Sequence, residues 1–296
     1  MQNLQGITLM ILAMAGFALG DVGIKALSVD LSLSQIVMTM GVLGTSFFYA
    51  LSRLKRQPVL TKDLAHPAIA IRTFAEIAAA LCMINALALT PLSLVTSVTQ
   101  AGPLAVALGA VVFFREKVGW RRWCAILTGL FGVLIILRPG TEGFNILALL
   151  SVGAMLALAA RDLSTRAAPR SLSNLQLATV GFAAFNLAAL VLIPFTDPWR
   201  VPDLRQTGLL ALAVVPTIAG YYAITAAMRI GDISVVTPFR YTRLLFGVCL
   251  GVLLFGETID IWMITGGSLV VASGIYTVLR ERKLHRLAKA DQQASL

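Results

Sequence analysis

Two stretches of the chain decide its fold: SLVTSVTQAGPLAVALGAVVFFRE at residues 93–116 and SVVTPFRYTRLLFGVCLGVLLFGE at residues 234–257. Their shared positions all lie at one offset of 141 residues: Ser93 and Ser234, Thr96 and Thr237, Phe114 and Phe255, Glu116 and Glu257. A Gly-rich apolar segment follows each glutamate. Chance similarity between two apolar segments is the alternative, but the shared polar positions favour an internal duplication.

The composition of the chain is that of a membrane protein. Hydrophobic residues make up 58% of it, and charged residues only 13%, against about 25% in soluble domains. Apolar runs near 20 residues recur along the chain, and each can cross a hydrocarbon core about 30 Å thick. These features exclude a soluble globule, a disordered chain and a disulfide scaffold. The three cysteines lie inside apolar segments without metal-ligand spacing: Cys82, Cys124 and Cys249.

The apolar runs predict an all-α integral membrane protein with ten transmembrane helices and no soluble domain. The predicted spans are 5–27, 34–52, 68–89, 93–114, 122–138, 145–161, 174–195, 207–228, 235–255 and 261–280. Five helices in each half is an odd number, so the second copy enters the membrane from the opposite side. We therefore predict a first repeat at 1–140, a second, inverted repeat at 141–282, and a basic cytoplasmic tail at 283–296.

Positive charge is distributed very unevenly over the predicted connections. If the N-terminus is cytoplasmic, the inner side holds 17 Lys and Arg residues, Lys117 among them, and the outer loops hold three. Positive residues collect in cytoplasmic loops of membrane proteins. The pattern predicts a multi-pass protein of the inner or plasma membrane with both termini in the cytoplasm. It also explains the basic composition without nucleic-acid binding.

Two segments of the chain resemble a known family. The segment from Ala86 through Leu-Thr-Pro-Leu-Ser to Phe-Phe-Arg-Glu, and its copy from Tyr222 to Phe255-Gly-Glu, are similar to the drug/metabolite transporter superfamily, and in particular to its EamA-domain members. The resemblance implies two inverted five-helix repeats around a central cavity. It also implies transport of a small metabolite such as an amino acid, a purine-like compound, S-adenosylmethionine or riboflavin.

Six charged residues fall inside the predicted helices, where each costs about 2.5–3.5 kcal/mol on insertion scales. Four of them are spaced four apart on one helix face. This spacing predicts two structural charge pairs, Asp21 with Lys25 and Arg72 with Glu76. Glu76 is also a predicted substrate-binding residue, since Glu76 or Asp21 would hold an amino group or a proton. Both acids are our candidates for proton coupling, although facilitated diffusion would need neither.

Arg240 and Arg243 lie three residues apart on one face of the ninth helix, which carries no acid. The planar guanidinium group binds carboxylates through two hydrogen bonds. We predict that these arginines bind a carboxylate, phosphate or electron-rich ring of the substrate. The alternative is that they bridge Asp21, Glu76 or backbone carbonyls and are architectural.

Gln100 and Tyr221 are the neutral polar residues that we predict to contact substrate. Each lies close to a proline near mid-depth: Gly102-Pro103 in the fourth span and Pro216 in the eighth. Helix breaks expose backbone groups where transporters bind ligands. Ordinary proline kinks and helix–helix hydrogen bonds are the alternatives.

These observations predict a secondary transporter that works by alternating access, most readily for an amino acid or amino-acid-like compound. A planar vitamin or nucleoside-like compound, such as riboflavin or S-adenosylmethionine, is the alternative substrate. No phosphate-binding loop for ATP is present, and we predict neither cofactor nor metal. A membrane enzyme is disfavoured because both histidines, His66 and His285, fall in connections; an accessory membrane protein would leave the duplication unexplained. Both a monomer and a homodimer fit the sequence.

Overall fold

The computed structural model describes residues 2–116, 119–141, 144–230 and 232–294. Its α-helices are α1 (Gln2–Leu27), α2 (Leu33–Leu54), α3 (Pro67–Leu89), α4 (Leu92–Thr99), α5 (Gly102–Phe114), α6 (Trp120–Leu137), α7 (Leu149–Ala167), α8 (Asn174–Leu192), α9 (Leu204–Ile230), α10 (Ile233–Val236), α11 (Thr242–Phe255) and α12 (Ile261–Ala294). Short 3-10 helices are η1 (Lys62–Ala65), η2 (Ile146–Ala148), η3 (Ile193–Phe195) and η4 (Thr237–Tyr241). Lys117 and the last two residues of the predicted tail lie outside the described residues.

Ten helical segments among the described residues are long and apolar enough to cross a membrane, as the sequence predicts. The sixth is longer than expected: it spans Ile146–Ala167, not 145–161. We had placed its end at the charged residues Arg161 and Asp162. The helix continues past them because they are neutralised inside the bundle, as described below.

The fourth and ninth spans are interrupted, each beside a proline. α4 ends at Thr99 and α5 begins at Gly102, with Pro103 in its first turn, where the missing proline N–H costs no helical hydrogen bond. The ninth span consists of α10, η4 and α11, and Pro238 lies in η4. Both interruptions occur at equivalent points of the two repeats.

Pro216, in contrast, does not interrupt its helix. α9 continues from Leu204 to Ile230 with Pro216 inside it, so the predicted break there is wrong. α1 packs closely along α9 at this point: a Cβ on Gly16 would lie 2.6 Å from the Pro216 carbonyl oxygen. The close neighbour supports the helix where proline removes one of its hydrogen bonds.

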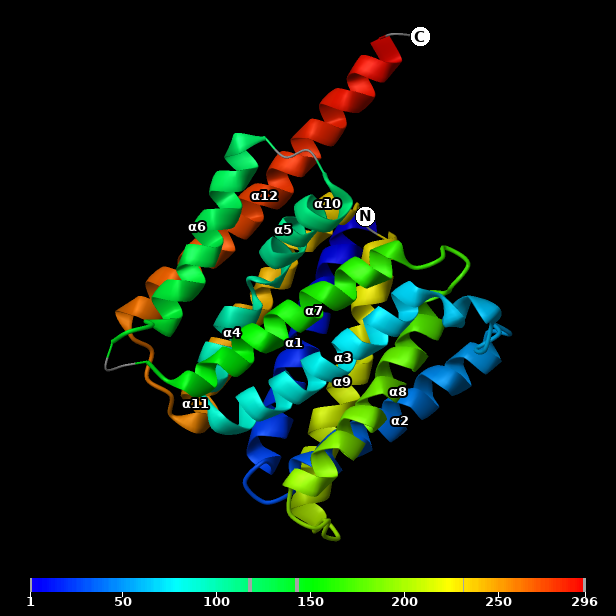
Figure 1. Cartoon of the computed structure of the whole chain (residues 1–296), viewed down its shortest axis with the longest axis vertical. Coiled ribbons are helices and arrows are strands. Elements are labelled where there is room, and N and C mark those ends of the chain that lie inside the picture. The colour runs from blue at the N-terminus through cyan, green and yellow to red at the C-terminus, as the bar shows by residue number, and fades with distance from the viewer. Residues whose placement is uncertain (1, 117–118, 142–143, 231, 295–296) are drawn as a thin grey trace.

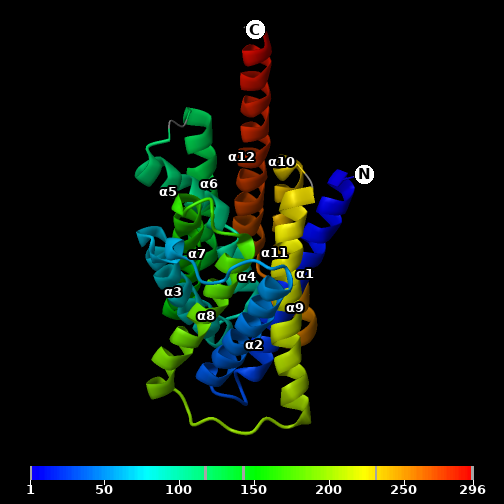
Figure 2. The same ribbon diagram turned by 90° about the vertical axis from the view of Figure 1, so that its right-hand side faces the viewer.

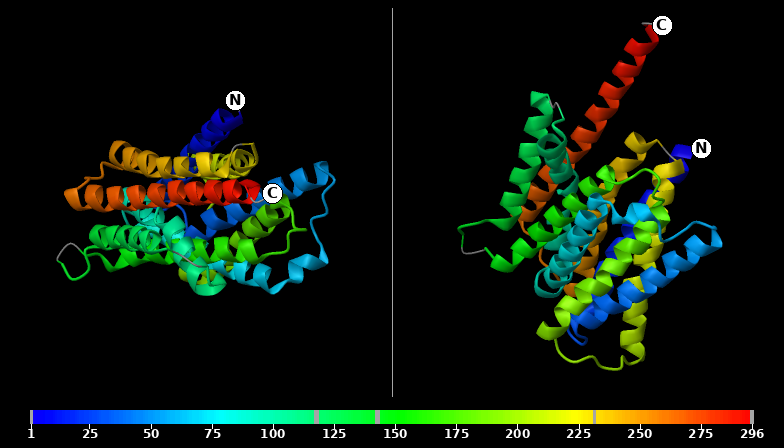
Figure 3. Two further views of the ribbon diagram at one scale, coloured as in Figure 1. Left: turned by 90° about the horizontal axis from the view of Figure 1, so that it is seen from above. Right: turned by 45° about the vertical axis from the view of Figure 1, so that its right-hand side comes forward.

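The most extensive helix packing joins one helix of each half (Figure 1). α1 packs on α9 and α3 packs on α7, which are equivalent pairs under the inverted repeat. The other pairs each join a helix to its own counterpart: α2 with α8, α4 with α11, and α6 with α12. Two further views show α6 and α12 side by side at one edge of the bundle (Figure 3). The two halves therefore interlock rather than stand as separate domains.

The two ends of the bundle differ in charge. Both termini emerge at one end (Figure 2), which we call the basic end; it carries the connections α2–α3, α5–α6, α7–α8 and α9–α10. The opposite end, which we call the far end, carries the connections α1–α2, α3–α4, α6–α7, α8–α9 and α11–α12. The predicted cytoplasmic charges that the structure describes lie in the connections of the basic end and the adjoining parts of helices, except Arg161, which lies within α7 and pairs with Glu76.

Candidate substrate cavity

A cavity of about 840 Å³ lies between the two halves. This volume is within the range of roughly 300–1,000 Å³ typical of small-molecule sites. It is lined from nearly every helix of the bundle. All the residues that we predict to contact substrate or carry protons line it: Asp21, Glu76, Gln100, Tyr221, Arg240 and Arg243.

A charged network joins α3 to α7 at the wall of the cavity. Arg161 donates to Asp162 Oδ1 through Nε at 3.0 Å and through Nη2 at 2.8 Å, and its Nη1 donates to Glu76 Oε1 at 3.3 Å. The other Glu76 oxygen lies 3.6 Å from Arg72 Nη2, the pairing that the spacing predicts. Arg72 Nε donates to the Thr165 hydroxyl at 3.0 Å. Glu76 is thus shared between two guanidinium groups on different helices.

Close packing by α8 encloses this network. Gly181 faces it, and a Cβ there would lie 3.3 Å from Arg72 Nη2 and 3.4 Å from Glu76 Oε2. Arg72 and Glu76 are both buried. Charges inside a bilayer are retained where they pair with one another and face the interior, which describes this group.

A second ion pair crosses the cavity wall between α1 and α11. Arg243 Nη2 donates to Asp21 Oδ2 at 2.7 Å, and its guanidinium lies over the Phe17 ring at 5.5 Å. Arg243 Nε is buried without a hydrogen-bond partner. Asp21 therefore takes its cation from the other repeat.

The predicted pairing of Asp21 with Lys25 is wrong. Lys25 lies 3.8 Å from Glu257 at the far end of the bundle, away from the cavity. The i, i+4 rule identifies neighbours on one helix face, but the acidic or basic partner of each side chain comes from another part of the chain: Arg243 of α11 for Asp21, and Glu257 of the α11–α12 connection for Lys25.

Arg240 differs from the other arginines of the cavity. Among the described residues, no hydrogen bond or ion pair is made by its guanidinium group, although its charge acts on Asp162 at longer range. Its backbone carbonyl accepts a hydrogen bond from Gln100 Nε2 at 3.0 Å. Gln100 lies between α4 and α5 and Arg240 lies in η4, so this bond joins the two interrupted spans at the centre of the molecule.

Aromatic rings also line the cavity. Tyr221 packs edge-on against Phe48 and Phe182, with centroids 5.4 Å and 5.8 Å apart, and Phe182 stacks on Phe185 at 5.6 Å. Tyr221, Phe182 and Phe185 line the cavity. They provide an apolar, π-rich wall with one hydroxyl group.

Arg161 and Asp162 are site residues that the predicted spans do not include as such. The predicted end of the sixth span at residue 161 puts Arg161 in a cytoplasmic connection, whereas it lies within α7. The signal that could have found them is the apolar composition beyond the pair, Leu163 and Ala167-Ala168, which allows another turn of helix.

The comparison with known families matches both halves of the chain. Residues 4–138 and residues 145–280 each match the EamA-like transporter family. The chain belongs to the EamA-like transporter family. Members of this family are ten-helix membrane transporters of the drug/metabolite transporter superfamily.

Several curated relatives of this EamA protein carry substrate names. The riboflavin transporter of Vibrio cholerae serotype O1 is 33% identical over 193 residues, which are 63% of this chain and 62% of that protein. The match therefore spans less than two thirds of that relative. The riboflavin transporter of Rhizobium johnstonii is 26% identical over 94% of this chain and 92% of its own length. The S-adenosylmethionine uptake transporter of Rickettsia bellii is 24% identical over 67% of each chain.

Proposed function

We propose that the protein is a secondary transporter that carries a planar, electronegative heterocycle of the riboflavin type through the cavity by alternating access. One observation carries this proposal: the guanidinium group of Arg240 lines the cavity and makes no hydrogen bond or ion pair with the residues that the structure describes, while Asp21, Glu76 and Asp162 are each paired with an arginine. The names of the relatives support the same substrate class.

The chemistry of a flavin matches this arrangement. Its flat tricyclic ring carries two carbonyl oxygens and hydrogen-bonding ring nitrogens, and its side chain carries hydroxyl groups. Arg240 would donate to the ring carbonyls, with Gln100 holding the backbone beneath it. Tyr221 and its phenylalanine neighbours would pack on the ring, as aromatic rings do at centroid separations of 4.5–7 Å. The Arg161–Glu76 network and the free Nε of Arg243 would face the hydroxyl groups.

The same geometry disfavours the amino-acid substrate that the sequence suggested first. An ammonium group would need an available carboxylate. Glu76 already binds two arginines, Asp162 binds Arg161, and Asp21 binds Arg243. Freeing Glu76 or Asp21 would leave Arg72 or Arg243 without its carboxylate in the membrane interior, at a cost of several kcal/mol.

The proposal places the basic end in the cytoplasm, with both termini there, because positive loops are retained on that side. Asp21 and Glu76 remain the proposed proton carriers, since they are acids that line the transport path. Flux that follows a pH gradient would involve them; flux indifferent to it would indicate facilitated diffusion.

Transport of labelled compounds into proteoliposomes tests the function. The panel is riboflavin, S-adenosylmethionine and a set of amino acids, each with and without a pH gradient. We expect saturable riboflavin flux that falls at least tenfold in Arg240→Ala. Arg240→Lys should be intermediate, because an ammonium group keeps the charge but loses the planar two-donor geometry. Arg205→Ala, at an exposed arginine of the far end, is the matched control and should transport normally.

Two results would contradict the proposal. Wild-type riboflavin flux in Arg240→Ala would remove Arg240 from the site. Saturable flux of an amino acid, with none of riboflavin, would reverse the choice of substrate class.

A further inference from the structure

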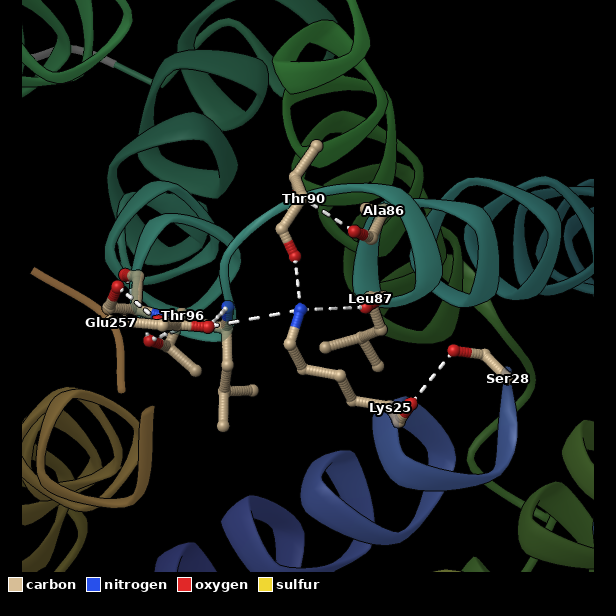
Figure 4. Close-up of polar contacts among 9 residues, drawn as sticks. Lys25, Ser28, Ala86, Leu87, Thr90, Thr96 and Glu257 are labelled. Atoms are coloured by element: carbon tan, nitrogen blue, oxygen red, sulfur yellow. Dashed lines mark hydrogen bonds and ion pairs between the residues drawn. The ribbon is translucent and has the colours of Figure 1, made fainter. Parts of the chain in front are cut away.

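Glu257 binds the first turn of α4 at the far end of the bundle (Figure 4). Its Oε1 accepts the backbone N–H of Leu92 at 2.6 Å, and its Oε2 accepts the N–H of Ser93 at 2.9 Å and the Ser93 hydroxyl at 2.6 Å. The N–H groups of a first helical turn have no partner within the helix and form the positive end of its dipole. Glu257 follows α11, so this contact ties the second repeat to the first.

Lys25 of α1 binds the neighbouring helix end in the opposite sense. Its Nζ donates to the carbonyls of Leu87 and Thr90 at 3.3 Å and 2.6 Å, and lies 3.8 Å from Glu257 Oε1 (Figure 4). These carbonyls form the negative end of α3. Lys25 and Glu257 therefore bind both helix ends where α3 meets α4, which we call the α3–α4 joint. We call Lys25 and Glu257, with these backbone partners, the far latch.

Two glycines of α11 allow this latch to form. A Cβ on Gly251 would lie 2.5 Å from Glu257 Oε2, and a Cβ on Gly247 would collide with the side chain of Thr96. α11 can approach α4 this closely only without side chains at these positions. The Gly247-x-x-x-Gly251 face thus serves packing inside the molecule.

The offset of 141 residues generates a second pair of the same kind at the basic end. Lys25 corresponds to Arg166 of α7, and Glu257 corresponds to Glu116 in the α5–α6 connection. The structure joins them: Arg166 Nη2 lies 2.5 Å from Glu116 Oε1. The counterpart of the α3–α4 joint, under the same offset, is the α9–α10 joint.

The two ion pairs differ in how far their side chains are exposed. The side chains of Lys25 and Glu257 are 16% and 9% exposed, whereas those of Arg166 and Glu116 are 57% and 28% exposed. Glu116 is bound to Arg166, and Arg166 lines the cavity.

The cavity is accessible at the basic end, where its lining includes residues at the ends of three helices: Arg122, Arg166 and Asn174. Toward the far end its lining includes Ile24 and Val37, and both are buried. At the far end, the residues that the latch holds are sealed: Leu92 and Ser93 are fully buried and Thr90 is 3% exposed. This conformation is closed at the far end and open toward the basic end.

We propose that the two pairs are alternating latches. Lys25–Glu257 holds the far end closed in this conformation. Arg166–Glu116 is the disengaged counterpart, which binds the α9–α10 joint and closes the basic end in the opposite conformation. The role of the latches in a transport cycle rests on the proposed function, but which end each one closes does not.

Thiol labelling of a cavity residue tests this directly. The full-length chain, with its three cysteines replaced by alanine, receives a reporter through Met83→Cys, at a cavity-lining position on the far-end half of α3. A membrane-impermeant maleimide is added to right-side-out and to inside-out vesicles, and the labelling rate from each side is measured. The test variants are Glu257→Gln and Glu116→Gln. Asp30→Asn is the matched control, because it neutralises an exposed ion pair of the same far end.

We expect Glu257→Gln to raise the ratio of far-side to basic-side labelling about tenfold, which equals about 1.4 kcal/mol of conformational equilibrium. Glu116→Gln should lower this ratio, and Asp30→Asn should leave it unchanged. Ser93→Ala removes one hydrogen bond of the latch and should raise the ratio less. It substitutes for Glu257→Gln if that variant does not reach the membrane.

The proposal is overturned if Glu257→Gln and Ser93→Ala both match Asp30→Asn, or if the two glutamate variants shift the ratio in the same direction. Labelling requires no substrate. A protein that fails to transport riboflavin but shows opposite shifts would refute the substrate and retain the latches. Riboflavin transport with an unchanged labelling ratio in both glutamate variants would support the substrate and refute the latches.

Discussion

Glu76 is the residue on which the charged network of the cavity depends, because it alone is shared by Arg72 and Arg161. Glu76→Gln should leave the buried Arg72 without an acidic partner among the described residues, whereas Arg161 keeps Asp162. Breaking a buried ion pair by removing one partner costs about 3–5 kcal/mol. We expect a marked fall in the thermal unfolding temperature of the purified protein in detergent.

Asp162→Asn is the matched comparison for this prediction. The Asp162 side chain is 37% exposed and, among the described residues, is paired with Arg161 alone, and Arg161 keeps Glu76 as a second partner. Its unfolding temperature should fall less than that of Glu76→Gln. Equal unfolding temperatures for wild type and Glu76→Gln would show that the network contributes nothing to stability.

Individual residues show what a sequence can reveal about such a site. Spacing along one helix was enough to predict the Arg72–Glu76 pair and to single out Arg240. It misassigned Asp21, because Arg243 reaches it from a helix 222 residues away in the chain. Partners on different helices leave no trace in local spacing, and the candidate site was therefore only partly predictable.

At the scale of helices, the contact of α1 with α9 depends on Gly16. A methyl group there would meet the Pro216 carbonyl oxygen at 2.6 Å, and backbone atoms cannot move aside cheaply. We expect Gly16→Ala to lower the thermal unfolding temperature. Gly208→Ala lies in α9 with open space around it, and should raise that temperature slightly because alanine favours helix over glycine by up to about 1 kcal/mol. Shifts of the same sign in both variants would contradict this packing.

Helix number and order were predictable because apolar runs of membrane length are a strong signal. The ends of the helices and the breaks within them were less predictable. Pro216 lies in a continuous helix, whereas Gly102-Pro103 lies at an interruption. Both sites contain proline, and what differs is the packing around them. The extension of α7 past Arg161 has the same origin, since a neighbouring helix supplies Glu76.

For the whole molecule, the duplication was visible in the sequence, but which end is open was not. An inverted repeat permits two conformations related by exchange of the halves, and they differ in which latch is engaged. The energy difference between them depends on contacts at both ends, and none of those is encoded as a local pattern. Lys25 illustrates this: its partners come from α3 and from the α11–α12 connection.

The inverted symmetry leads to a prediction for the double variant Glu116→Gln with Glu257→Gln. Both latches act on the same equilibrium between the two conformations. A substitution in a latch shifts that equilibrium only as far as it changes the free energies of the two conformations by different amounts. The latches lie at opposite ends of the bundle, and effects at separated sites add to within about 0.5 kcal/mol. Opposite shifts should therefore cancel, and the labelling ratio of the Met83→Cys reporter should return to within about threefold of the parent. A double variant that keeps the full shift of Glu257→Gln would show that only the far latch sets the balance and that Arg166–Glu116 takes no part in closing the basic end.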